Sequence, residues 1–328
     1  MSIAPAPKTR FDRWAILVPV VPIVLVVAFI VAGCVRPLAV KGGQPMDASG
    51  AFQGRTAVAT AAHDGSARPP SGWPVVRSSK SGAPLIATHL LHPDSSDPKA
   101  FAAAAWLSPT GLRFTLVPGT MQPGGSWSTN AEVPAEQRSS LAAIFNSGFK
   151  YKDLDGGFRA EGRTVVPLKQ GEASLAITSD GAATIGAWGT DIKENADLVA
   201  VRQNLHLIVD GSQAVDGLLT RHDGSWSSEH HQTQHTLRSG LGQLADGSLV
   251  YVAGPDMDLQ QLADALISVH AVKGMQLDIH PNMIVFHLFQ PGSGSTPGTA
   301  EQLLDLMTAP LDRYLVPDRR DFITATER

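Results

Sequence analysis

The chain is poor in cysteine, in aromatic side chains and in clustered basic residues, and each shortage excludes a class of protein. Cys34 is the single cysteine among 328 residues, which excludes an intrachain disulfide and a zinc site built from cysteines. Aromatic residues make up only 6% of the chain, whereas 31 glycines and 23 prolines indicate many turns and short strands rather than an all-helical bundle. The net charge of −4 shows no basic face, so no nucleic-acid partner is predicted.

Two common catalytic signatures are also absent. There is no Gly-x-Ser-x-Gly turn, so nucleophilic serine catalysis of that type has no support. The stretch EHHQTQH at 229–235 spaces His231 and His235 as zinc ligands on a helix, but it lacks the order His-Glu-x-x-His and is flanked by Ser and Gln. We therefore expect a solvated loop there and predict neither a metal nor a cofactor.

One long apolar run stands near the N-terminus. Residues 1–13 contain Lys8, Arg10 and Arg13, and residues 14–33, WAILVPVVPIVLVVAFIVAG, are uncharged and long enough to span a bilayer. The basic flank predicts a cytoplasmic N-terminus and a single-pass anchor in the cell membrane. The sequence VAGC, ending at Cys34, also matches a lipoprotein processing box, with Cys34 lipidated. Both alternatives place the rest of the chain outside the cytoplasm.

The remaining chain divides into a linker and one globular domain. Residues 34–72 are rich in Gly, Ala, Ser and Pro, which predicts a flexible tether, and residues 73–328 carry the folded domain. Asp-Gly pairs at 180–181 and 246–247, each flanked by strand-like residues, predict tight hairpin turns. Strands are expected within the following ranges: 84–91, 100–108, 112–119, 140–149, 174–188, 204–211, 235–254 and 274–289.

Two segments have helical periodicity. Residues 258–272 place leucines on one face behind Asp258 as N-cap, and residues 299–315 begin with the capping-box pair Thr299 and Gln302. Many strands with few helices predict an α+β fold, with a mainly antiparallel or mixed sheet in a single domain after the membrane helix.

Four polar clusters lie at the ends of predicted strands. Asn146 and Lys150 flank Gly148, Asp210 ends an apolar strand, Arg238 lies within one, and Asp278 and His280 share a strand face. Each has an alternative explanation. Asn146 can belong to an ordinary turn and Asp210 to a hairpin, while Arg238 and Asp278 can be internally paired core residues.

Taken in order, several segments resemble the phosphodiester glycosidase family: AIFNSGFK, SLAITSDG, NLHLIVDGS, LRSGLGQLADGSLVYVAG and LQQLADALISVHAVKGMQLDI. The resemblance covers roughly residues 140–290, and the preceding region is similar to a bacterial, membrane-anchored branch of the family. It departs from the family pattern at Ser147, where a glycine is usual, and after Asp278, where Ile-His-Pro-Asn replaces a glycine-rich stretch.

The resemblance implies a function. It implies a membrane-tethered, extracytoplasmic hydrolase of sugar-1-phosphodiesters, with cell-envelope glycopolymers as the expected substrates. Asp278 and Asp210 would be the catalytic carboxylates, His280 a substitute acid or base, and Arg238 with Asn146 and Lys150 the phosphate site. The alternative is a non-catalytic module that binds envelope glycan or phosphate on the same fold.

Overall fold

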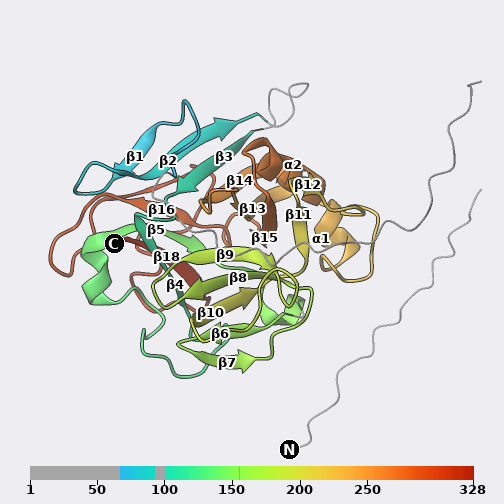
Figure 1. Ribbon diagram of the computed structural model, residues 1–328, viewed down its shortest axis with the longest axis horizontal. Helices are drawn as coiled ribbons and strands as arrows, with labels where there is room; N and C mark the ends of the chain where they lie inside the picture. The colour runs from blue at the N-terminus through green and yellow to red at the C-terminus, as the bar shows by residue number, and fades with distance from the viewer. Residues whose placement is uncertain (1–66, 93–100, 155) are drawn as a thin grey trace, which may run out of the picture. The chain divides into compact units, whose positions relative to one another are not determined.

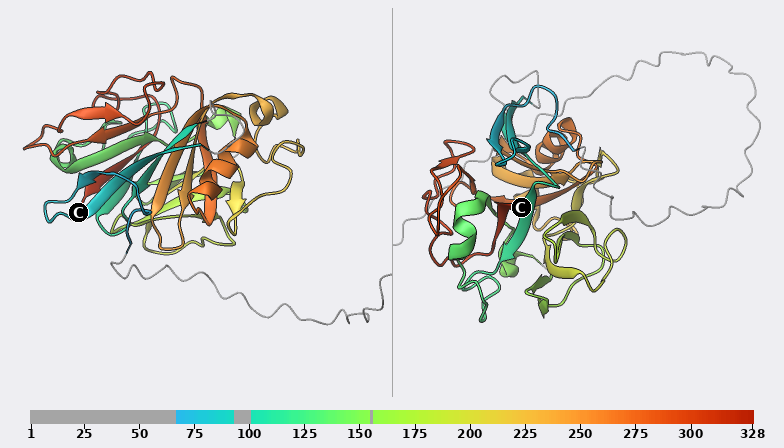
Figure 2. Two further views of the ribbon diagram at one scale, coloured as in Figure 1. Left: turned by 90° about the horizontal axis from the view of Figure 1, so that it is seen from above. Right: turned by 60° about the vertical axis from the view of Figure 1, so that its left-hand side comes forward.

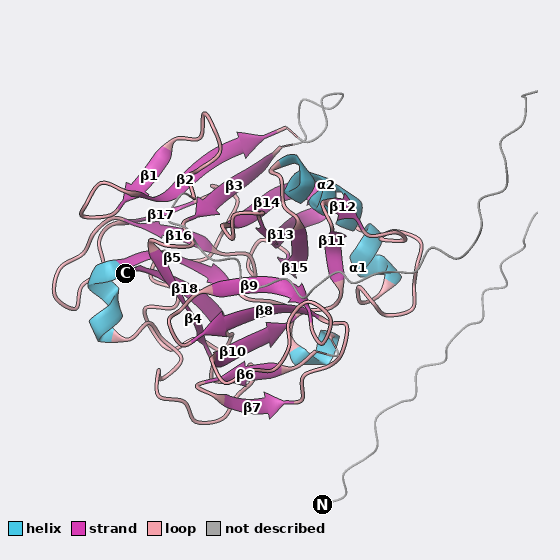
Figure 3. Cartoon of the chain, in the orientation of Figure 1, coloured by secondary structure: helices cyan, strands magenta, loops and turns pink. Residues whose placement is uncertain are grey.

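Antiparallel strands are the main regular secondary structure of the chain that the computed structural model describes, which comprises residues 67–92, 101–154 and 156–328 (Figures 1 and 3). All described residues belong to one compact unit of the chain. The predicted membrane helix, Cys34 and most of the predicted tether lie outside the described residues. Within the described part, no helix combines the length and apolarity needed to cross a membrane.

The strands form three sheets. The largest contains, in spatial order, β1 (Val75–Ser78), β2 (Pro84–Leu91), β3 (Ala102–Leu107), β14 (Leu249–Met257), β13 (Thr236–Gln243), β15 (Lys273–Ile279), β11 (Leu207–Asp210) and β12 (Gln213–Ala214). A second contains β7 (Arg163–Val166), β6 (Phe158–Ala160), β10 (Leu198–Gln203), β8 (Ala173–Thr178) and β9 (Ala183–Ala187). The third contains β17 (Ala300–Gln302), β16 (Phe286–Phe289), β5 (Leu141–Asn146), β18 (Phe322–Glu327) and β4 (Leu112–Val117).

Every described pairing between these strands is antiparallel, which confirms the mainly antiparallel α+β prediction. The two Asp-Gly hairpins are also confirmed. Gly181 joins β8 to β9 and Gly247 joins β13 to β14, both at positive φ, a conformation that glycine adopts without steric cost. The described helical elements are α1 (Glu229–Thr233), α2 (Leu259–Ser268) and the 3-10 turns η1 (Ala135–Ser140) and η2 (Tyr151–Asp153).

Helix α2 packs against the eight-stranded sheet, as predicted for residues 258–272 (Figure 2). Asp258 caps it, and Gln261 completes a capping box. Glycines in the sheet allow this close contact. A Cβ on Gly242 would lie 2.8 Å from the Cβ of Ala271, just beyond the helix, and 3.1 Å from Leu266. The Gly-rich pattern of β13 is therefore explained by helix packing.

The helix predicted at 299–315 is wrong. The segment begins with β17, in which Gln302 pairs with His287 of β16, and continues as turns. The Gln302 side chain donates to the carbonyl of Ala309 at 2.8 Å, which folds the segment back on itself. Pro310 cannot donate a helical hydrogen bond, and the apolar side chains of Leu304 and Met307 are buried from loop positions instead.

Candidate active site

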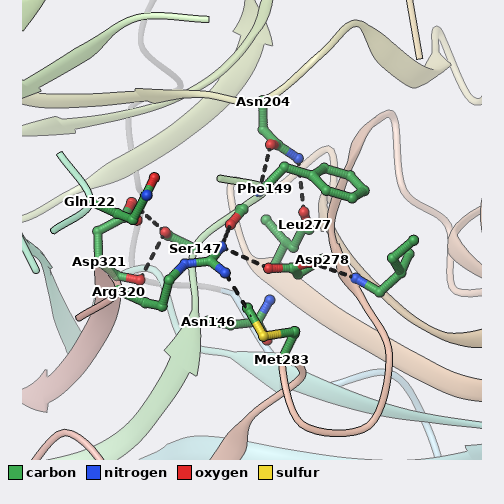
Figure 4. A network of polar contacts seen from close by, with 12 residues as sticks. Gln122, Asn146, Ser147, Phe149, Asn204, Leu277, Asp278, Met283, Arg320 and Asp321 are labelled. Carbon is green, nitrogen blue, oxygen red and sulfur yellow. Dashed lines mark hydrogen bonds and ion pairs between the residues drawn. The ribbon is translucent and has the colours of Figure 1, made fainter. Parts of the chain in front are cut away.

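The candidate site forms where strand ends from all three sheets meet (Figure 4). Asp278, the penultimate residue of β15, is 5% exposed. One carboxylate oxygen, Oδ1, accepts from the backbone N–H of Ile279 at 2.8 Å, and the other, Oδ2, pairs with Arg320 Nη2 at 2.8 Å. Burial raises the pKa of the Asp278 carboxyl to about 6, although Arg320 and the Ile279 amide act in the opposite direction. The protonated form of Asp278 therefore predominates below about pH 6.

Arg320 holds Asp278 against the turn that follows β5. Its Nη2 also donates to the carbonyl of Gly148, and its Nη1 lies 3.9 Å from the sulfur of Met283 (Figure 4). The Nε of Arg320 has no hydrogen-bond partner among the described residues. The guanidinium thus directs Nη2 to the carboxylate and to Gly148 and Nη1 to Met283, and leaves Nε without an acceptor among the described residues.

A second Arg–Asp pair supports the first. Arg202, in β10, binds Asp321 through a 2.7 Å contact between Nε and Oδ2, and both side chains are almost completely buried. Arg202 Nη2 donates to the carbonyl of Phe149 at 2.6 Å, and Ser147 donates its hydroxyl to Asp321. Since Asp321 follows Arg320 directly, the two pairs fix one short segment at the start of β18.

Asn204 joins the turn after β5 to β15. Its Oδ1 accepts from the N–H of Phe149 at 2.9 Å, while its Nδ2 donates to the carbonyls of Gln276 and Leu277. A Cβ on Gly148 would lie 2.8 Å from Asn204 Oδ1, so this position needs glycine. Asn204 is therefore a structural tie between the two halves of the site.

Asn146, predicted as a ligand-binding residue, has its side-chain hydrogen bonds inside the protein. Its Oδ1 accepts from Val285 N and from the Tyr251 hydroxyl, both at 3.0 Å, and its Nδ2 donates to Ser239 Oγ at 3.2 Å. The residue is 3% exposed. It adjoins Ser147 and Gly148 but supports the site from behind.

Arg238, predicted to bind phosphate, makes its hydrogen bonds away from Asp278. It is fully buried and donates to the carbonyls of Met257, His231 and Gln234 at 2.5, 2.6 and 2.8 Å. Burial lowers the pKa of its guanidinium to about 10. Within the described chain, no hydrogen bond or ion pair joins it to Asp278, and it clamps the segment around α1 instead.

Asp210 and Asp278 are too far apart to flank one glycosidic bond. Asp210 pairs in register with Lys273 and forms an ion pair with it at 2.7 Å in an exposed hairpin. Asp278 lies five residues further along β15. At about 3.3 Å per residue, the two backbone positions are about 16 Å apart. Paired glycosidase carboxylates lie roughly 5–10 Å apart, so the paired role predicted for Asp210 does not fit.

The other two predicted residues lie near the site but outside the Asp278–Arg320 network. His280 is exposed, has a φ of 77° and places Nδ1 3.2 Å from Thr236 Oγ1. Lys150 is half-buried and precedes η2, where its carbonyl accepts from Asp153 N. Within the described ranges, no group of three or more His, Cys, Asp or Glu side chains is arranged to hold a metal ion.

A cavity of about 370 Å³ opens elsewhere on the molecule. It lies at the turn between β1 and β2 and beside the C-terminal residues Glu327 and Arg328. None of the residues of the Asp278–Arg320 network lines this cavity. Its lining residues do not form a catalytic group, so we assign no chemistry to it.

Sequence comparisons find neither a matching family model nor a matching curated protein. The fold, however, distantly resembles that of one phosphodiester glycosidase domain. The catalytic domain of zebrafish N-acetylglucosamine-1-phosphodiester alpha-N-acetylglucosaminidase, auto-inhibited by its pro-peptide, superimposes with a TM-score of 0.50 and 15% identity, covering 76% of this chain and 86% of that one.

Two further structures are more distant. A hypothetical protein from Synechocystis gives a TM-score of 0.42 at 12% identity, over 74% of this chain and 62% of that one. A putative exported protein from Burkholderia pseudomallei K96243 gives 0.37 at 11% identity, over 69% and 74%.

Proposed function

We propose that this chain is a membrane-tethered, extracytoplasmic hydrolase of sugar-1-phosphodiester bonds, acting on cell-envelope glycopolymers. The observation that carries the proposal is the Asp278–Arg320 pair at the end of β15. The resemblance assigns the family's acidic residue to this strand end, and an arginine with remaining donors lies directly beside it. The distant fold likeness to a phosphodiester glycosidase domain agrees with this assignment.

In this reaction, Arg320 takes the role that the sequence suggested for Arg238. Its Nε, which has no acceptor among the described residues, binds an oxygen of the phosphodiester, for which a guanidinium is suited. The bond between the sugar C1 and the phosphate oxygen breaks, and the electron pair leaves with the phosphate. Asp278, protonated below its pKa of about 6, gives its proton to that oxygen. A water oxygen bonds to C1 and the water gives up one of its protons, so the products are free sugar and a phosphomonoester.

The test is release of free sugar from a panel of sugar-1-phosphodiesters by the full-length protein in detergent. Asp278→Asn is expected to lower kcat/KM by about 100-fold, a usual magnitude for loss of a general acid. Asp305→Asn, a change at an exposed carboxylate, is the matched control. Equal activity in Asp278→Asn and the control would show that Asp278 is not the acid.

Arg320 is tested by a change that keeps its charge. Arg320→Lys removes the planar donor fork, so KM is expected to rise by about 10-fold, corresponding to about 1.4 kcal/mol of lost binding. The neighbouring Arg319 is exposed, and Arg319→Lys is expected to behave like the wild type. If both changes leave KM unaltered, the phosphate is not bound by Arg320.

Two observations favour the second candidate, a non-catalytic module that binds envelope glycan or phosphate. Asp278 and Arg320 are already paired, and each side chain is at most 10% exposed. Pro281 also removes a backbone donor from the segment after Asp278. Saturable binding of a sugar-1-phosphodiester without release of sugar, weakened by Arg320→Lys, would support this candidate over the hydrolase.

The membrane tether is a separate part of the proposal and rests on residues 1–34 of the sequence. Deleting residues 1–34 should move the protein from the membrane fraction to the soluble fraction. Changing Cys34→Ser separates the two anchors, because it abolishes attachment of a lipid but leaves a membrane-spanning helix intact.

A further inference from the structure

The histidine-rich stretch at 229–235 does not lie apart from the candidate site. The ring of His231, in α1, stacks against Phe149 with centroids 6.1 Å apart and planes inclined at 26°. Phe149 follows Gly148, whose carbonyl binds Arg320, and Phe149 itself packs with Ile279, the residue after Asp278. His231 therefore stands beside the segment that holds the Asp278–Arg320 pair.

Two contacts fix the position of the His231 side chain. Ser227 Oγ lies 2.8 Å from His231 Nδ1, and Ser227 has a φ of 70°, which is uncommon for serine. The Ser227 hydroxyl also lies 3.5 Å from the backbone carbonyl oxygen of Asp153, a long contact. Because a carbonyl oxygen can only accept, the hydroxyl is the donor in this contact. In the arrangement with that proton directed to Asp153, Ser227 Oγ accepts from Nδ1–H, and the lone pair of His231 is on Nε2; this is the tautomer that a base role for His231 requires.

Arg238 fixes the main chain of the same segment. Its Nη2 donates to the carbonyls of His231 and Gln234, and its Nε donates to Met257 in β14. A fully buried arginine bound to backbone carbonyls holds α1 in one place against the sheet. From the sequence, Arg238 could be either a phosphate ligand or an internally paired residue. In the structure its contacts are internal, and they hold the α1 segment in position.

The charges facing His231 come from four elements. Burial lowers its pKa most; the Asp153 carboxylate in η2 raises it, and His230, His280 and Arg238 lower it further. The net effect is a pKa below 6.5, so the imidazole is neutral at neutral pH. A neutral imidazole with a free Nε2 lone pair can accept a proton from water.

We propose that His231 is the general base of the candidate site, positioned by Ser227 and Arg238. This proposal rests on the proposed hydrolysis of a sugar-1-phosphodiester. Nε2 takes one proton from the water whose oxygen bonds to the sugar C1, while Asp278 gives its proton to the departing phosphate oxygen. The site then needs one group that is protonated and one that is neutral at the same pH, which is a general pattern in acid–base enzymes.

The decisive comparison is His231→Gln against His230→Gln. His230 is the exposed neighbour on the same helix and is the matched control. His231→Gln is expected to lower kcat/KM by about 100-fold and to remove the fall in rate on the acidic side, where the base becomes protonated. His230→Gln should keep the acidic limb of the profile, displaced only slightly upward because His230 no longer lowers the pKa of His231. Circular dichroism of each variant checks that the fold is kept.

Ser227→Ala tests positioning rather than contact with substrate. Losing the Nδ1 acceptor should lower kcat more than it raises KM and should shift the acidic limb of the pH profile. A variant with the wild-type profile would show that Ser227 has no part in the base. Ser227→Thr, which keeps the hydroxyl, is expected to recover part of the rate.

The outcomes separate this proposal from the proposed function. If Asp278→Asn abolishes sugar release while His231→Gln behaves like His230→Gln, the hydrolase stands and the base is overturned. If the wild type releases no sugar, the 15N NMR chemical shifts of the His231 ring still show which nitrogen carries the proton at neutral pH. An unprotonated Nε2 supports the proposal, and a protonated Nε2 overturns it.

Discussion

At the scale of single residues, the site depends on which buried groups are paired with one another. Asp278 is paired with Arg320, 42 positions away in the sequence, and Asp321 with Arg202, 119 positions away. Asp278 has a raised pKa in spite of its partner, because the cost of burying a carboxylate exceeds the stabilisation from one guanidinium and one amide. That balance makes a measurable prediction for stability.

The free energy of unfolding should depend on pH through Asp278. Because its pKa is raised from 3.8 to about 6 in the folded protein, its contribution is most favourable below pH 3.8 and is lost as the pH rises through about 6. The full difference corresponds to roughly 3 kcal/mol. Wild type should therefore lose stability relative to Asp278→Asn between pH 4 and pH 7, measured by urea unfolding. A constant difference across this range would contradict the prediction.

The sequence identified Asp278 but could not identify its partner. An Arg-Arg-Asp stretch at 319–321 carries no periodicity, and only the fold brings Arg320 to β15. Arg238 was visible as an arginine within a strand, but β13 has a register shift against β15 between Arg238 and Gly240. Since a shift of one residue reverses the face of a side chain, the side that Arg238 faces could not be obtained from spacing alone.

At the scale of elements, strands and tight turns were predictable because their chemistry is local. The range predicted at 84–91 coincides with β2, and each Asp-Gly pair closes a hairpin. The helix predicted at 299–315 failed because the same apolar periodicity also suits a loop that covers a sheet, and Gln302 bonds across the loop. The prediction of helix α2 was correct because two local signals are both present. The capping box marks where the helix begins, and its apolar face packs on the glycines of the sheet beneath it.

The contact between α2 and the sheet is testable with a double-mutant cycle. Gly242→Ala places a Cβ 2.8 Å from the Cβ of Ala271, and overpacking of this kind costs about 1–3 kcal/mol. Ala271→Gly removes the clashing atom, so the double variant should be more stable than the sum of the single changes by about 1 kcal/mol. Chemical denaturation of the four proteins measures this coupling. Simple additivity would show that Gly242 is not required for helix packing.

At the scale of the whole described domain, the polar network joins three sheets at one place. Asn204 follows β10 and binds β15, Arg202 in β10 binds Asp321 before β18, and Arg320 binds Asp278 in β15 (Figure 4). Each connection links two different sheets. The elements that hold the domain together are therefore also the elements that position the candidate acid and the candidate phosphate ligand.

Breaking the most buried of these connections should destabilise the domain as a unit. Asp321→Asn leaves the Arg202 charge without its partner in a fully buried position, which costs about 3–5 kcal/mol. Glu194→Gln breaks the surface pair with Arg159, whose carboxylate side chain is 58% exposed, and should cost less than about 1 kcal/mol. Urea unfolding should show one cooperative transition for Asp321→Asn at a lower midpoint with an unchanged m-value, because the lost pair joins two sheets through the same network that also reaches the third. Separate transitions would show that the sheets unfold independently and that the network does not couple them.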